Sequence, residues 1–429
     1  MSPLTGAGVR RRFLVLTALR WLPTGLMIPV LVLLPLDRGV GLADLGLAFA
    51  VQGVVVLALE LPTGGLADAL GRRTVLLAST VVGLASIALF LRADSVGELV
   101  VVFALQGVYR ALDSGPLEAW YVDTALALDP EAEFDRGLSG HGVVLGLAVA
   151  GGALLAGGLV ALDPVPGIEA LATPVVLSLL LQVAGVVGLA VLMVEPRPAS
   201  GLGAAWDAAM ATPRTIGDGF RLVRRSGVLA AVLAVELFWG FGMVTFESLP
   251  PVRLEELLGS ADAAAAVTGP AAAAAWAASA AGAATVPWLA RRLGMAPTAA
   301  LMRILQGATV VAMGLAAGVP GLLVAYLLCY TIHGASNPAH MTLLHREATG
   351  PVRATVVSLN SMVSQPAGAL GVVVLTGVAE GVSVSTAMVA GGLVLALAAP
   401  LYLPAWRKER RLVAPELPLT PDPSGPPTS

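Results

Sequence analysis

Hydrophobic and polar positions follow one another in long blocks along the chain, without the short periods of amphipathic helices or strands. Each apolar block is roughly 20 residues long, which is enough to cross a bilayer as an α-helix. Inside lipid the backbone N–H and C=O groups must be satisfied within the segment, so such blocks predict transmembrane helices. The predicted spans are 13–35, 43–63, 74–91, 99–122, 140–162, 173–194, 228–249, 263–289, 297–317, 320–343, 355–379 and 383–404.

Basic residues fall almost entirely on one side of this span map. With the N-terminus inside, nineteen of them lie in the inner segments and only Arg38, Arg92 and Arg253 lie in outer loops. A missing or invented span near the middle would move all later loops to the other side, so the bias supports twelve spans. Both termini are therefore expected in the cytoplasm.

A polar interval divides the spans into two groups of six. The strings LADALG (66–71) and LARRLG (289–294) lie 223 residues apart at equivalent places, and the same offset maps Arg110 onto His333. Internal repeats of this kind are typical of transporters. The sequence therefore predicts an all-α membrane protein with twelve transmembrane helices in two pseudo-symmetric six-helix bundles. The predicted domains are an N-terminal bundle (1–195), a cytoplasmic linker with an amphipathic helix (196–227), a C-terminal bundle (228–405) and a disordered tail (406–429).

Composition excludes several classes of function. Hydrophobic residues make up 57% and charged residues 12% of the 429 residues, and the mean hydropathy is +0.85, so lipid must cover much of the surface. The single cysteine, Cys329, allows neither an intramolecular disulfide nor a cysteine metal cluster. The only lysine, Lys408, follows no glycine-rich phosphate loop, which excludes an ATPase of the chain's own. We expect no enzymatic activity, catalytic residue, cofactor, metal site or nucleic-acid partner.

The loop after the second span, ELPTGGLADALGRR (60–73), resembles the loop signature of the major facilitator superfamily. The segments RALDSGPLEAWYVD (110–123) and NPAHMTLLHREATGPVRATVVSLNS (337–361) resemble the branch that contains drug-efflux proteins. The resemblance implies the fold of that superfamily and transport by alternating access. The residues that match the loop signature are Gly64, Leu66, Ala67, Asp68, Gly71, Arg72 and Arg73.

This loop is expected to form a gate together with other charged residues. Gly64 and Gly71 allow a tight turn and a close approach of helices, and the resemblance implies that Asp68 accepts hydrogen bonds from the start of the eleventh span. Arg72 is expected to pair with a carboxylate at the cytoplasmic end of the fourth span, for which Asp123 is the natural candidate. Such a cluster would latch the two halves on the inside when the protein opens outward; the alternative is that the charges only anchor the loop at lipid headgroups. The further residues assigned to the gate are Arg73, Glu118, Asp123 and Arg353.

Ionisable side chains within the predicted spans mark a candidate site for substrate and protons. A charge at the centre of a transmembrane helix costs about 2.5–3.5 kcal/mol on insertion scales, so it calls for a function or a partner. The first, fourth, seventh and tenth spans carry such groups, and the resemblance implies that these four surround a central cavity. The candidates are Arg20, Glu60, Arg110, Asp113, Glu236 and His333, joined by Trp239 and Asn337.

Glu236 is the predicted proton carrier, because burial among apolar groups favours the neutral form of a carboxyl group. The alternative is that Glu236 forms a structural ion pair, with Arg20 or Arg110 as its partner. Asp113 lies three residues after Arg110, a spacing that favours a local pair.

The remaining polar residues of the spans have two interpretations each. Arg110 could bind an anionic substrate group through its forked guanidinium. His333 could titrate near neutrality, or it could be a hydrogen-bonded core residue. Trp239 could line an apolar pocket or serve only packing. Arg303 in the ninth span is expected to extend toward the interface.

The sequence thus predicts a secondary active transporter: a proton-coupled antiporter that exports small amphipathic molecules or drugs, as in multidrug resistance. Its expected partners are a small-molecule substrate, protons and the lipid bilayer, and it is expected to work as a monomer. The arginine-rich, lysine-poor composition is typical of GC-rich bacterial genomes, which favours a bacterial inner membrane. The alternatives are proton-coupled uptake of a sugar or organic acid, and a membrane protein that does not transport.

Overall fold

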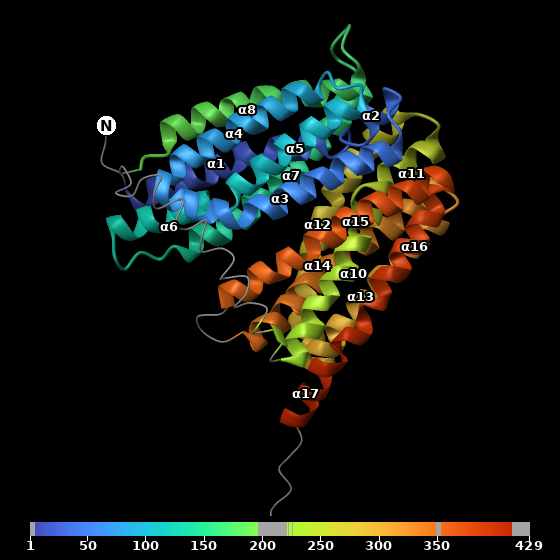
Figure 1. Cartoon of the computed structure of the whole chain (residues 1–429). Helices are drawn as coiled ribbons and strands as arrows, with labels where there is room; N and C mark the ends of the chain where they lie inside the picture. Colours follow the sequence, from blue (N-terminus) through green and yellow to red (C-terminus); the bar gives the residue numbers. More distant parts are fainter. Residues whose placement is uncertain (1–4, 196–220, 222, 225, 349–352, 414–429) are drawn as a thin grey trace, which may run out of the picture.

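The computed structural model describes residues 5–195, 221, 223–224, 226–348 and 353–413, without the side chains of 60–65, 68, 353–355 and 412–413. Within these ranges the chain is almost entirely helical and contains no β-strand (Figure 1). Nine of the described helical segments are long and apolar enough to cross a membrane. The predicted fold class is confirmed.

The N-terminal half supplies the first six spans. Its fourth span is predicted as one helix over 99–122 but is broken between α5 and α6, because Gly115 has a φ of +93° and Pro116 begins the next helix. The break places the end of α5 inside the bundle. The elements are α1 (Gly6–Met27), α2 (Leu33–Asp37), α3 (Leu42–Leu70), α4 (Arg72–Phe90), α5 (Val96–Asp113), α6 (Pro116–Leu128), α7 (Asp135–Leu162), η1 (Ala170–Ala172) and α8 (Thr173–Leu192).

The C-terminal half supplies the other six spans, and two predicted boundaries were wrong. The seventh span continues past 249 as a second helix whose second and third residues are prolines, and the last helix continues to Val413 inside the predicted tail. Most of the linker 196–227, including its predicted amphipathic helix, lies outside the described residues. The elements are α10 (Gly227–Glu247), α11 (Leu249–Leu258), α12 (Ala261–Leu293), α13 (Met295–Leu315), α14 (Val319–Glu347), α15 (Arg353–Gly381), α16 (Val384–Leu397), η3 (Ala399–Tyr402) and α17 (Leu403–Val413).

The two halves repeat one another in detail. Gly71 ends α3 and precedes α4, and Gly294, 223 residues later, ends α12 and precedes α13. Both glycines have a φ of +91°, which favours glycine over other residues. In the first half α1 packs on α7 and α8, and α3 on α5; in the second half α10 packs on α15 and α16, and α12 on α14. The internal repeat seen in the sequence is therefore a structural repeat.

The halves meet along two helix pairs, α3 with α15 and α7 with α12. A Cβ built on Gly269 of α12 would lie 2.5 Å from the carbonyl oxygen of Ala153 on α7, so the two backbones touch. The Glu380 carboxylate, at the end of α15, accepts a hydrogen bond of 2.6 Å from the Ala43 N–H at the start of α3. These contacts lie at the end of the bundle that carries Arg38, which we call the distal face.

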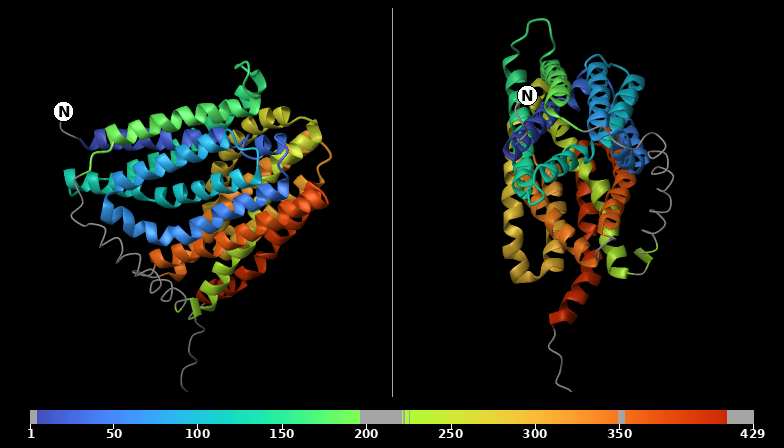
Figure 2. Two further views of the ribbon diagram at one scale, coloured as in Figure 1. Left: turned by 45° about the horizontal axis from the view of Figure 1, so that its top comes forward. Right: turned by 90° about the vertical axis from the view of Figure 1, so that its left-hand side faces the viewer.

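At the opposite end, the basic face, the described ion pairs stay within one half. Arg72 pairs with Asp123, as the sequence predicts, and Arg346 Nη1 lies 2.6 Å from Glu409 Oε1. Glu195 accepts hydrogen bonds from the backbone N–H groups of the first two residues of α4. Figures 1 and 2 show the halves meeting near α2 and α11 and diverging toward α6 and α17. The helices of the two halves therefore diverge toward the basic face.

Within the C-terminal half, α12 and α14 approach so closely that glycine is required. A Cβ built on Gly282 would lie 1.8 Å from the carbonyl oxygen of Thr331. We expect Gly282→Ala to push these helices apart and to lower the free energy of unfolding by about 1–3 kcal/mol or more, as measured by denaturant-induced unfolding in detergent. Gly146→Ala on α7, where a Cβ would meet no atom within 4 Å, is the matched control and should not destabilise the protein. Equal stability of the two variants would contradict this prediction.

Candidate functional site

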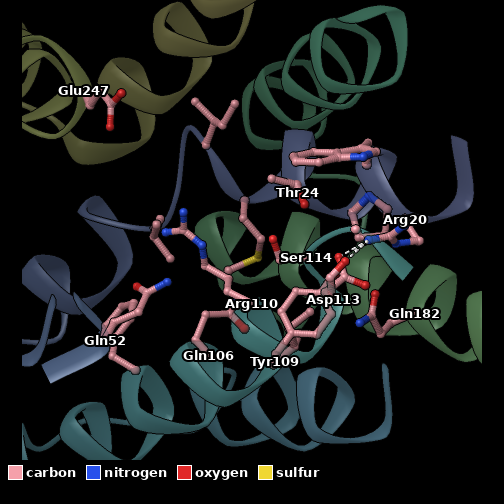
Figure 3. A pocket seen from close by; sticks show the side chains of 18 of the residues that line it. Arg20, Thr24, Gln52, Gln106, Tyr109, Arg110, Asp113, Ser114, Gln182 and Glu247 are labelled. Atoms are coloured by element: carbon pink, nitrogen blue, oxygen red, sulfur yellow. Dashed lines mark hydrogen bonds and ion pairs between the residues drawn. The ribbon is translucent and has the colours of Figure 1, made fainter. Parts of the chain in front are cut away.

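A cavity of about 650 Å³ lies against the inner face of the N-terminal half (Figure 3). Its lining comes from α1, α3, α4, α5, α6 and α8, with Glu247 of α10 contributed by the C-terminal half. Both apolar and hydrogen-bonding side chains face it, which suits a small molecule with an apolar body and polar substituents. The polar lining residues are Arg20, Thr24, Gln52, Gln106, Tyr109, Arg110, Asp113, Ser114, Glu118, Gln182 and Glu247; the apolar ones include Trp21, Met27, Ile28, Leu31, Ile87 and Phe103.

Arg20 and Asp113 form an ion pair in the cavity wall (Figure 3). The Arg20 guanidinium also donates a hydrogen bond of 3.2 Å to the carbonyl oxygen of Asp113. The expected pair between Asp113 and Arg110 is therefore absent from these contacts, because α5 ends at Asp113 and its carboxylate reaches across to α1. Arg20 is 7% exposed, so its charge is held inside the wall by this one carboxylate.

Arg110 differs from Arg20 because its side chain is exposed to the cavity. Within the described part of the chain it has no hydrogen bond or ion pair. Glu247 lines the same cavity from α10, and its carboxylate carries the charge opposite to that of Arg110. Glu247 is not among the predicted site residues, although this carboxylate lies inside the predicted span 228–249.

Glu118 also faces the cavity and is bonded within the N-terminal half. Its Oε1 lies 3.2 Å from His141 Nε2, and His141 Nδ1 lies 3.0 Å from the Thr17 hydroxyl. The predicted gating residues Arg72 and Asp123 form a separate pair at the basic face. The structure therefore places Glu118 with the cavity, and its role in gating stays a prediction.

Glu236 lies in a second polar cluster, inside the C-terminal half and away from the cavity lining. Its Oε1 is 3.2 Å from His340 Nε2, which is also 3.0 Å from Asn360 Oδ1. His340 Nδ1 is 2.8 Å from the Tyr402 hydroxyl. A histidine protonated at Nε2 satisfies all three contacts, since Nδ1 then accepts from the tyrosine. Four elements, α10, α14, α15 and η3, converge here.

Arg303 supplies the positive charge of this cluster. Its guanidinium lies 3.8 Å from Glu236 Oε1 and donates a hydrogen bond of 3.0 Å to Gln306 Oε1. Arg303 is 3% exposed, so the expectation that it extends toward the interface was wrong. The partner of Glu236 is likewise neither Arg20 nor Arg110. Both corrections have one cause: α13 turns its polar face toward α10.

His333 continues the cluster toward aromatic residues. Its Nδ1 is 3.2 Å from Gln306 Nε2, and its ring stacks on Trp239 at a centroid distance of 6.1 Å. His333 and Trp239 do not line the cavity. Asn337, which is exposed on α14, does not line it either. The remaining candidates lie outside the described side chains: Glu60, Gly64, Asp68 and Arg353.

The structure thus divides the sequence-predicted site residues into two groups. Arg20, Arg110 and Asp113 share one cavity in the N-terminal half, whereas Glu236 and His333 form a buried network in the C-terminal half. The two groups differ in their access to ligands. The first is accessible to a small molecule, and the second holds ionisable groups away from solvent.

Comparison with known proteins is consistent with this architecture. The family model of the Major Facilitator Superfamily matches residues 13–372. No curated protein sequence matches the chain significantly. Among solved structures, the nucleoside transporter NupG is 12% identical, with a TM-score of 0.75 over 93% of this chain and 99% of that chain.

Two further solved structures show the same fold. A bacterial homologue of the human lysosomal transporter Spinster, in an inward-facing and occupied conformation, is 14% identical with a TM-score of 0.74 over 93% of this chain and 96% of that chain. The human organic anion transporter MFSD10 is 17% identical with a TM-score of 0.59 over 93% of this chain and 100% of that chain. At these identities the likeness shows the fold alone.

Proposed function

Because the chain belongs to the major facilitator superfamily, and is therefore a membrane transporter, we propose that it exports small amphipathic organic molecules by alternating access in exchange for protons. Two similar halves rock about a site between them, and substrate and protons bias opposite states. The protein has no ATPase motif to supply energy, so an ion gradient takes that role.

One observation carries the proposal: the cavity is amphipathic, and the C-terminal half adds Glu247 to a lining that otherwise comes from the N-terminal half. Its wall combines Trp21 and Phe103 with the amide and charged groups of α3 and α5. The excess of arginine at the basic face assigns that face to the cytoplasm. An exporter loads its substrate into such a cavity from that face and releases it at the other.

Proton coupling is proposed to act through the carboxyl group of Glu236. The residue is 5% exposed and bonded to His340, and Arg303 lies close by, so a change in its charge alters contacts between several helices of the C-terminal half. A carboxyl group at this depth is expensive to keep without a function. The cavity and the carboxyl group lie in different halves, which allows substrate and proton to act on the rocking equilibrium separately.

Reconstitution in liposomes tests this function directly. With an imposed pH gradient, we expect flux of a small amphipathic solute only while the gradient lasts, and Glu236→Gln should lower that flux by about tenfold or more. The matched control is Glu131→Gln, which changes an exposed carboxylate between α6 and α7 and should transport normally. The direction of flux relative to the gradient separates export from uptake. Flux that survives an uncoupler unchanged would contradict proton coupling.

A further inference from the structure

The two arginines of the cavity are in different electrostatic states. Arg20 is buried in the wall and paired with Asp113. Arg110 is exposed to the cavity, and no hydrogen bond or ion pair joins it to any residue that the structure describes. A guanidinium is permanently charged and presents donors in a planar fork that fits a carboxylate or phosphate. Arg110 is thus the one cavity arginine that is ready for an anion.

The surroundings of Arg110 are suited to the same kind of ligand. Figure 3 shows Arg110 near the middle of the lining, with Gln52 and Gln106 beside it and Ser114 nearby. The amides and the hydroxyl can donate further hydrogen bonds to an anionic group. The apolar residues of the lining, Met27 among them, would cover the organic part of such a molecule.

Glu247 opposes Arg110 from the other half of the protein. It belongs to α10, whereas Arg110 belongs to α5, and both side chains line the cavity, so their opposite charges favour each other. In Figure 3 Glu247 lies at the edge of the site, away from the other labelled side chains. It also borders a small pocket formed by Pro250, Pro251 and Tyr326. Among the described lining residues, Glu247 is the carboxylate of the C-terminal half, and through its charge it would compete for the arginine that an anionic ligand would use.

We infer that the substrate is a small organic anion whose charged group binds Arg110, and that Glu247 is its competitor within the protein. This inference rests on the proposed function and narrows its substrate class. When the anion binds, its charge neutralises that of Arg110. The electrostatic attraction between Arg110 and Glu247, which joins the two halves, is then lost. Substrate binding then favours separation of α5 and α10, which is the movement that alternating access requires.

A cationic substrate held by Glu247 fits the observations less well. The pocket beyond Glu247 offers mainly apolar side chains, Pro250, Pro251 and Leu254 among them. A cation there would also meet the positive charge of Arg110, whereas an anion at Arg110 meets donors on several sides. The positive charge of Arg110 therefore favours an anionic ligand over a cationic one.

Binding of matched probes to the purified protein in detergent tests the inference. The members of each probe set share one apolar skeleton and differ in charge. One set is 3-phenylpropanoate, its amide and 3-phenylpropylamine. Two further sets carry a benzyl or a naphthylmethyl group as the apolar skeleton. We expect the carboxylate to bind and the amide and amine to bind at least about tenfold more weakly. Arg110→Gln should weaken carboxylate binding by about ten- to a hundredfold, whereas Arg110→Lys should retain part of it. Arg92→Gln, which changes an exposed arginine in the loop before α5, is the matched control and should bind as the unmodified protein does.

Glu247→Gln is the decisive variant, because it should change the affinity for the carboxylate probe in the direction opposite to Arg110→Gln. Removing the competing carboxylate should tighten carboxylate binding by about three- to tenfold, a gain that misfolding cannot produce. Preference for the amine or the amide, unchanged binding in Arg110→Gln, weaker binding in Glu247→Gln, or binding of no carboxylate in any set would each overturn the inference. Failure of proton-driven flux with anion binding intact would instead overturn only the proposed function.

Discussion

Glu236→Ala is expected to lower the free energy of unfolding by about 3–5 kcal/mol, which is the usual effect of removing one partner from a buried ion pair. Glu236 is the only carboxylate among the described residues that lies within 4 Å of the Arg303 guanidinium. An arginine cannot neutralise itself by losing a proton. Its charge would therefore stay buried beside Gln306, with a hydrogen bond but no counter-charge. Denaturant-induced unfolding in detergent measures the loss.

Variants at Arg303 test whether the unpaired charge, and not the loss of the side chain, causes the destabilisation. Arg303→Gln should cost less than Glu236→Ala, because the carboxyl group that remains can take up a proton and stay neutral. The double variant Glu236→Gln with Arg303→Gln should recover part of the stability, since no unpaired charge is left. If Glu236→Ala unfolds at the same denaturant concentration as the unmodified protein, the cluster in the C-terminal half does not contribute to stability as its contacts imply.

Gly269→Leu is expected to abolish transport by holding the halves apart at the distal face. A Cβ on Gly269 would lie 2.7 Å from the Gly157 Cα and 2.5 Å from the Ala153 carbonyl oxygen, so any side chain there collides with the backbone of α7. The conformation with α7 and α12 in contact then becomes costly, and the population shifts toward the state that opens at the distal face. We expect transport to fall by about a hundredfold, and measurement in proteoliposomes checks this.

Labelling from each side of the membrane distinguishes trapping from simple damage. In a Cys329→Ser background, a cysteine introduced at Ser114 reports on access to the cavity. Gly269→Leu should make it react faster with a membrane-impermeant maleimide added at the distal face, and more slowly from the basic face. Gly158→Leu on α7, where a Cβ would meet no atom within 4 Å, should change neither rate. Unchanged labelling combined with normal transport would show that α7 and α12 need not touch during the cycle.

Much of the architecture could be read from the sequence because it depends on local properties. An apolar block of roughly 20 residues must be helical in lipid whatever it packs against, and the arginine bias follows from loop position alone. The repeat at Gly71 and Gly294 was visible for the same reason, since a turn with positive φ selects glycine locally. The pair between Arg72 and Asp123 followed from two helix ends that the span map already placed on one face.

The partners of the buried charges were decided only by tertiary structure. Asp113 pairs with Arg20 and not with Arg110, and Glu236 lies beside Arg303, because each helix is rotated and tilted by its packing. Successive residues on a helix point about 100° apart, so a modest rotation exchanges one partner for another and the sequence does not state that rotation. The opposition of Glu247 and Arg110 depends in addition on how the two halves meet. The sequence by itself determined which segments cross the membrane and where the costly charges lie along them; the packing of the helices decided which of those charges share a cavity and which are buried together.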